Sequence, residues 1–105
     1  MQESLGSRDF AAHLHTTFKI ETPLELELEM AEVVDRSNQQ VEQFSVIFSG
    51  PVSPWLQQGT YSLQHTKMGE VSLFLVPLGP RDGRMLYEAV FSRLVATPAS
   101  TPGVG

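Results

Sequence analysis

The chain has 105 residues, 41% of them hydrophobic and 18% charged, which is typical of one globular domain and unlike a disordered chain. Its 12 acidic and 7 basic residues give a net charge of −5, and the basic residues are scattered, so we expect no binding to nucleic acid. Cysteine is absent, which excludes disulfides, thiol nucleophiles and thiolate metal sites.

No segment has the pattern of a membrane span or a secretory signal. The longest apolar run, Val71 to Leu78, is far too short to cross a bilayer. The first ten residues lack an apolar stretch flanked by basic residues. We therefore expect no membrane insertion and a cytoplasmic location when the protein is made.

The N-terminal third predicts a helix followed by strands. Ser7 or Asp9 could cap a short helix that ends near Leu14, and residues 16–21 have the β-branched and aromatic types of a strand. From Leu24 to Met30 apolar residues alternate with glutamate, and this period of two indicates a strand with one buried and one solvated face. Polar residues 35–43 predict a loop.

The middle of the chain predicts two more strands joined by a long connection. Phe44, Val46 and Phe48 alternate with smaller residues, and Gly50-Pro51 ends that run. Trp55 and Leu56 are too apolar for an ordinary loop, so we expect them to cover one end of the core. Tyr61, Leu63 and His65 then define a strand in which these three side chains share one face.

The last third predicts two strands on either side of a tight turn. Residues 70–76 are apolar on both faces, so we expect a strand in the middle of the sheet with both sides covered, by the N-terminal helix, a barrel wall or a second subunit. Asp82-Gly83 is a strong turn signal, and Arg84 to Leu94 is the sixth strand, with Met85, Tyr87, Ala89 and Phe91 on one face.

These elements predict an all-β fold with one short N-terminal helix, in which about six antiparallel strands form a small barrel or roll. Residues 1–95 form a single β domain, and residues 96–105, rich in proline, glycine and serine, form a C-terminal tail.

Three polar residues are candidate ligand-binding groups. His65 shares a strand face with Tyr61, and Glu88 lies between Leu86 and Val90 on an otherwise apolar face, where a buried carboxylate needs a partner. If Glu88 and His65 met in a cleft, they could act as an acid–base pair. The alternatives are structural: a hydrogen-bonded wall histidine, and a solvent-facing or structurally paired glutamate.

Other features give weaker signals. His13 and His15 lack a third ligand nearby, so we predict no metal site, and no motif indicates a cofactor or a catalytic residue. Trp55 and Leu56, beside two prolines, are candidate partner-binding residues, with capping of the core as the structural alternative.

The segments FAAHLHTTFKI, FSVIFSGP, QQGTYSLQH, MGEVSLFLVPLGP and MLYEAVF together resemble a family of small bacterial proteins known only as a domain of unknown function. The resemblance extends from about Phe10 to Phe91. It implies an association with phage tail-collar-type proteins, and hence an accessory role in a phage-tail-like or surface assembly.

The leading hypothesis is a noncatalytic interaction or assembly protein that binds a protein partner, with a tail-collar-type protein as one candidate and a homodimer as another. The alternative is a small-ligand-binding β-barrel that uses Tyr61, His65 and Glu88. The third hypothesis is a minimal acid–base enzyme.

Overall fold

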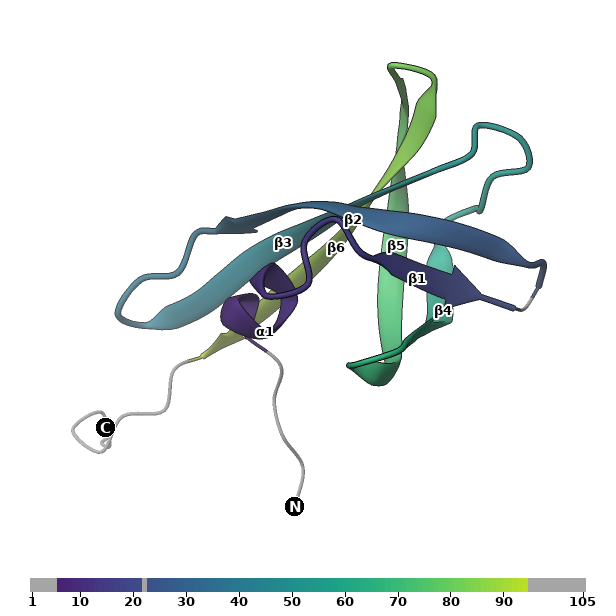
Figure 1. Cartoon of the computed structure of the whole chain (residues 1–105). Helices are drawn as coiled ribbons and strands as arrows, with labels where there is room; N and C mark the ends of the chain where they lie inside the picture. Colours follow the sequence, from purple (N-terminus) through teal and green to yellow (C-terminus); the bar gives the residue numbers. More distant parts are fainter. Residues whose placement is uncertain (1–5, 22, 95–105) are drawn as a thin grey trace.

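The computed structural model describes residues 6–21 and 23–94, and in these ranges the chain forms one helix and six strands (Figure 1). The helix is α1 (Ser7–Ala11), and the strands are β1 (Thr17–Ile20), β2 (Leu26–Asp35), β3 (Val41–Gly50), β4 (Gly59–His65), β5 (Gly69–Arg81) and β6 (Arg84–Leu94). All strand pairs are antiparallel, and the order β1-β2-β3-β6-β5-β4 closes into a barrel, which confirms the predicted fold class. The predicted tail lies outside the described residues.

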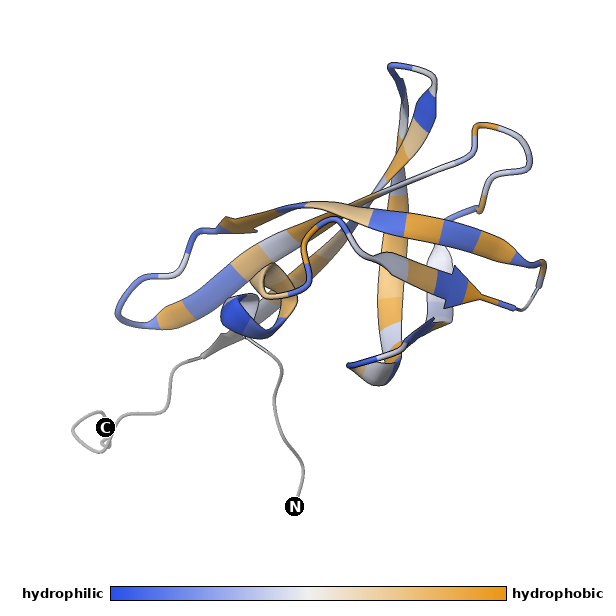
Figure 2. Cartoon of the chain, viewed as in Figure 1, coloured by the Kyte–Doolittle hydropathy of each residue, from blue (hydrophilic) through white to orange (hydrophobic). Residues whose placement is uncertain are grey.

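The alternation in β2 produces the expected two-faced strand, visible as alternating colours in Figure 2. Leu26, Leu28 and Met30 are buried, and Glu27 between them is exposed. The strand continues to Asp35 and does not end at Met30, because its pairing with β3 shifts register between Met30 and Glu32. Such a bulge interrupts the period of two without ending the strand.

Side chains from all six strands fill the barrel interior. The fully buried members include one from each strand in turn: Phe18, Leu28, Phe48, Leu63, Leu75 and Tyr87. The inward faces predicted for β3, β4 and β6 are confirmed by their buried residues. Burial of this apolar area is the main stabilising contribution to the fold.

The short helix α1 closes one end of the barrel. The ring of Phe10 lies 5.9 Å from that of Phe44 and 5.1 Å from that of Phe91, and the latter two rings stack at 4.5 Å. The helix ends at Ala11 and not near Leu14, because the chain then turns and His15 adopts a positive φ of 65°. Within the described ranges, no helix has the length and apolar character needed to cross a membrane.

Strand β5 lies between β6 and β4, but its outer face is not covered by another part of the described chain. Phe74 is 50% exposed and Leu78 52% exposed, while α1 packs against β2 and β3. The expected position inside the sheet is therefore confirmed, and of the expected covers the N-terminal helix does not lie on this face. The Asp82-Gly83 turn is confirmed, with positive φ angles of 53° and 78°.

Candidate functional site

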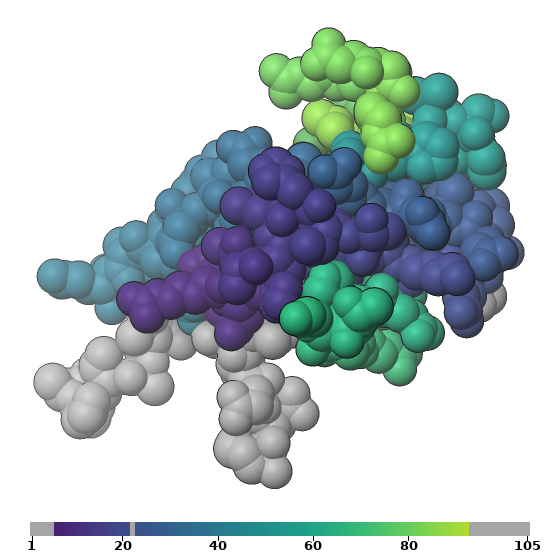
Figure 3. Space-filling model, viewed as in Figure 1, coloured from purple at the N-terminus to yellow at the C-terminus, as the bar shows by residue number. Residues whose placement is uncertain are grey.

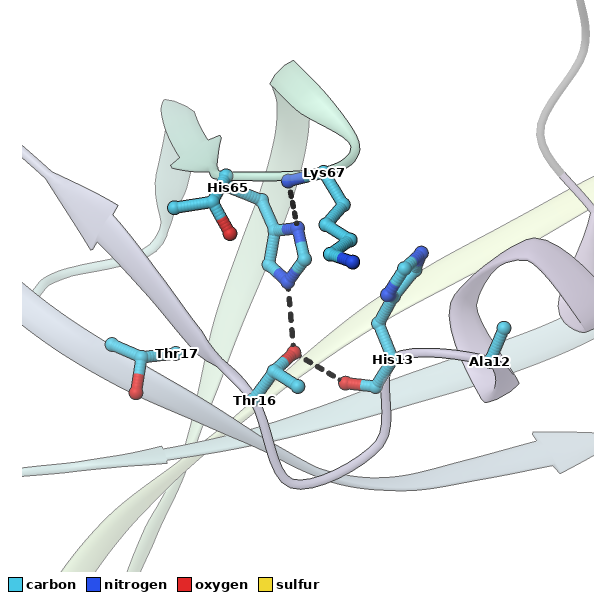
Figure 4. Close-up of a pocket in the computed structure, with 7 residues that line it drawn as sticks. Ala12, His13, Thr16, Thr17, His65 and Lys67 are labelled. Carbon is cyan, nitrogen blue, oxygen red and sulfur yellow. Dashed lines mark hydrogen bonds between the residues drawn. The ribbon is translucent and has the colours of Figure 1, made fainter.

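His65 lies at the end of β4, where its side chain is buried and every ring nitrogen has a partner. Its Nδ1 accepts the backbone N–H groups of Lys67 and Met68, each at 3.0 Å. Its Nε2 lies 2.9 Å from Oγ1 of Thr16, and that hydroxyl is 2.5 Å from the carbonyl oxygen of His13. Figure 4 shows the resulting chain of hydrogen bonds.

These contacts fix the protonation state of His65. Because Nδ1 accepts two N–H groups, it carries no proton, and the proton of the neutral ring must be on Nε2. Nε2–H then donates to Thr16, whose hydroxyl donates to the carbonyl of His13. Burial lowers the pKa of His65, and the nearby charges of His13 and Lys67 lower it further. His65 is therefore a hydrogen-bonded residue of the barrel wall, which is the structural role considered above as the alternative to ligand binding. Neither of its ring nitrogens is free for acid–base chemistry.

The hydrogen bonds of His65 lie at the seam where the barrel closes. In the described part of the chain, β1 and β4 share one registered pair, Lys19 with Gln64. The bond from His65 to Thr16 adds a second connection at this seam, between the end of β4 and the residue that precedes β1. Figure 3 shows the β4–β5 turn directly against the N-terminal segment.

A surface pocket of about 460 Å³ opens beside His65. It is lined around that ring by Ala12, His13, Thr16, Thr17, Thr66 and Lys67. A second pocket of about 360 Å³ adjoins it along the seam and shares Thr17, His65 and Thr66. In Figure 4 the side chains of His13 and Lys67 extend into the same space.

The three histidines do not converge on a metal site. The ring of His13 packs 4.8 Å from that of His65, whereas Nδ1 of His15 lies 3.7 Å from a carboxylate oxygen of Glu29. Among the described residues, no group of three histidine, aspartate or glutamate side chains is placed to hold a metal ion.

Tyr61 and Trp55 lie at the opposite end of β4. The hydroxyl of Tyr61 donates to the carbonyl oxygen of Gln57 at 2.6 Å, and the buried hydroxyl of Tyr87 accepts the N–H of Leu56 at 2.8 Å. Leu56 is buried, as expected for a residue that covers the core, while Trp55 is 47% exposed at the edge of a pocket of about 270 Å³.

The three candidate ligand-binding residues do not meet in one cavity. Tyr61 and His65 line different pockets, at the two ends of β4, with the buried Leu63 between them. Glu88 points to the opposite side of the barrel wall, because its neighbours Tyr87 and Ala89 face the core. The acid–base pair that would require contact between His65 and Glu88 is not formed.

Glu88 lies within an apolar surface that we call the outer patch, formed by Ile47, Phe74, Val76, Leu86 and Val90. Glu88 pairs with Ile47 on one side and with Val76 on the other, so these three residues lie side by side across β3, β6 and β5. Leu86 and Val90 are the next outward residues of β6, and Phe74 is the next outward residue of β5. Phe74 and Val90 are 50% and 55% exposed.

Comparison with protein-family models gives a match over most of the chain. The model of a family described as Domain of unknown function (DUF6916) matches residues 5–91. The chain belongs to the DUF6916 family. No curated protein and no solved structure matches the chain. The DUF6916 assignment confirms the resemblance to a domain of unknown function, and it carries no activity or partner with it.

The sequence did not predict that Thr16 is the hydrogen-bond partner of His65, or that His13 and Lys67 line one pocket. Thr16 lies 49 positions from His65 in the chain, so only the barrel closure brings them together. The two lysines of the chain, Lys19 and Lys67, line the two adjoining pockets at the seam, which composition alone could not reveal.

Proposed function

We propose that this DUF6916 domain is a noncatalytic protein-interaction domain, and that the outer patch is the surface that binds its partner. The observation that supports this proposal is the exposure of neighbouring apolar side chains on one sheet face, with Phe74 at 50% and Val90 at 55%. Contiguous exposed apolar surface is typical of interaction sites, whereas single exposed apolar residues need no explanation.

The charge pattern of the patch indicates the kind of partner. Glu88 is half-buried among apolar residues, and a covering partner would remove it further from water. A desolvated carboxylate is costly unless an opposite charge or hydrogen-bond donors meet it. The partner is therefore expected to present an apolar surface that contains an arginine or lysine.

The same pattern disfavours a homodimer through this face. A two-fold contact centred on the patch would bring Glu88 close to its own copy. Two carboxylates that approach in a dry interface repel each other. A second, different protein is therefore the occupant that we propose.

The setting that we propose is a multiprotein assembly. The resemblance to proteins associated with tail-collar-type domains suggests a phage-tail-like or surface assembly, in which a small accessory barrel would bind a larger component. The exposed Trp55 is the competing contact surface, since tryptophan is enriched at the centres of interfaces.

The test is affinity capture from an extract of the encoding organism with the wild-type chain and three variants. Phe74→Ser with Val90→Ser removes the exposed part of the patch, and Glu88→Lys reverses its charge. Val52→Ser is the control, because Val52 is 43% exposed outside the patch. One protein that is retained by the wild type and the control and lost with both patch variants supports the proposal. Equal retention by all four chains contradicts it.

Analytical ultracentrifugation separates the two kinds of partner. The wild-type chain is expected to sediment as a monomer, because the occupant is a different protein. A concentration-dependent dimer that Phe74→Ser with Val90→Ser abolishes would assign the patch to self-association and overturn the choice of partner.

A further inference from the structure

The pocket beside His65 contains a lysine and, among the described residues, no acidic one, in a protein that is acidic as a whole. The chain carries a net charge of −5 and has 12 acidic residues, yet none of the described side chains that line this pocket is acidic. His13 and Lys67 both line it, and Figure 4 shows both side chains extending into it. A cleft lined by one sign of charge raises the local concentration of ions of the opposite sign.

The donors in this pocket are also available. Within the described ranges, neither His13 nor Lys67 forms an ion pair with a carboxylate. Lys19, which lines the adjoining pocket, differs, because its Nζ lies 3.5 Å from a carboxylate oxygen of Glu25. Thr17 and Thr66 also line the pocket, and each carries a hydroxyl that can donate to a ligand after rotation of its side chain. The hydroxyl of Thr16 and Nε2 of His65 are hydrogen-bonded to each other, so we do not count them as donors to a ligand.

The donors come from both sides of the barrel seam. His13 precedes β1 and Thr17 is its first residue, whereas Thr66 and Lys67 belong to the turn between β4 and β5. The hydrogen bond between His65 and Thr16 holds these two segments together and so fixes the spacing of the donors. This rigid support reduces the cost of ordering the donors around a ligand.

We propose that this pocket binds a phosphate group, either as free inorganic phosphate or as a small phosphate monoester. A phosphate presents three acceptor oxygens and a charge near −2, which matches an ammonium, an imidazole and two hydroxyls better than a carboxylate with two oxygens does. The volume of about 460 Å³ lies in the range of small-molecule sites.

The test is titration of the ¹⁵N-labelled full chain with inorganic phosphate near neutral pH, with sodium chloride keeping the ionic strength constant. Saturable shifts of the amide signals of residues 13, 17, 66 and 67 are expected. Lys67→Gln should weaken binding about threefold to tenfold, since one partly solvated charge-assisted hydrogen bond is lost. Arg36→Gln removes the same charge from an exposed loop and should leave the affinity unchanged.

Three results would overturn the site. These are the absence of saturable shifts, an equal loss of affinity in Lys67→Gln and Arg36→Gln, and an affinity for acetate as high as for phosphate. A phosphate monoester such as glycerol phosphate distinguishes the two sources of the group: tighter binding than inorganic phosphate assigns the site to an ester. Thermal unfolding gives an independent readout, because a ligand that contacts both sides of the seam raises Tm in the wild type more than in Lys67→Gln.

Discussion

His65 and Thr16 connect the two segments that meet where the barrel closes. The Nε2 of His65 lies 2.9 Å from Oγ1 of Thr16, and the ring is fixed from its other side by two backbone N–H groups. One histidine thus joins the end of β4, the following turn and the residue before β1. The stability and shape of the surrounding pocket depend on this arrangement.

Replacing Thr16 with valine should destabilise the fold. The substitution preserves shape but removes the acceptor of the buried Nε2–H and leaves that donor unsatisfied, at a cost of about 1–3 kcal/mol. Urea denaturation measures the loss. Thr17→Val is the matched control, since Thr17 is exposed on the adjacent β1 position and should change stability by less than about 0.5 kcal/mol. Equal stability of the two variants would show that the bond contributes nothing.

The stability of the domain should fall as the pH drops below the ordinary pKa of histidine. The pKa of His65 is lowered in the folded state from a reference of 6.5, so the unfolded chain binds its proton more readily. The contribution of His65 is therefore complete above pH 6.5 and decreases as the pH falls from 6.5 toward the lower folded pKa. Midpoints of urea denaturation measured across this pH range test whether stability falls as the pH drops.

Two variants isolate the source of this pH dependence. His65→Asn retains an acceptor near the Nδ1 position but cannot titrate, so it should flatten the dependence. His15→Asn should retain it, because His15 is exposed and asparagine tolerates the positive φ of 65° at that position. If the stability of His65→Asn depended on pH as steeply as that of the wild type, another group would be responsible for the dependence.

The Trp55 loop should depend on the buried hydroxyl of Tyr87. Tyr87→Phe leaves the N–H of Leu56 without its partner at 2.8 Å and should cost about 1–3 kcal/mol. Tyr61→Phe removes a more exposed bond to Gln57 and should cost about 0.5 kcal/mol or less. Tryptophan fluorescence compares the two variants directly, because Trp55 is the single tryptophan and is next to Leu56. The emission should change more in Tyr87→Phe than in Tyr61→Phe. A larger effect from Tyr61→Phe would reverse the assigned roles.

Neighbouring residues of β5 should respond in opposite ways to truncation. Leu73 is 4% exposed and faces the core, so Leu73→Ala should cost about 2–5 kcal/mol. Phe74 is 50% exposed, and Phe74→Ala should cost less than about 1 kcal/mol despite the larger side chain removed. Comparable losses would place Phe74 in the core and remove the outer patch from consideration.

The sequence predicted those parts of the fold that depend on local pattern. Arg84 to Leu94 forms the sixth strand with the expected bounds, and its inward residues Tyr87 and Ala89 are buried. The Asp82-Gly83 turn follows from the tolerance of these residues for positive φ. In both cases neighbouring residues determine the structure.

The features that were missed depend on contacts between distant segments. The bulge after Met30 extends β2 because β3 continues to pair with it, and no local signal marks that pairing. The partner of His65 is Thr16, from the other end of the closed sheet, and the exposure of Phe74 follows from the position of α1 on β2 and β3. The alternation predicted which way Glu88 points relative to Tyr87, but not what surrounds it.

Photocrosslinking in the native cell tests the proposed function most directly. A photoreactive phenylalanine analogue replaces Phe74 in one chain and Trp55 in another, since both side chains are about half exposed. We predict an adduct with a different protein from position 74 and none from position 55. An adduct from position 55 alone, or an adduct of two copies of this 11.6 kDa chain from position 74, would contradict the account.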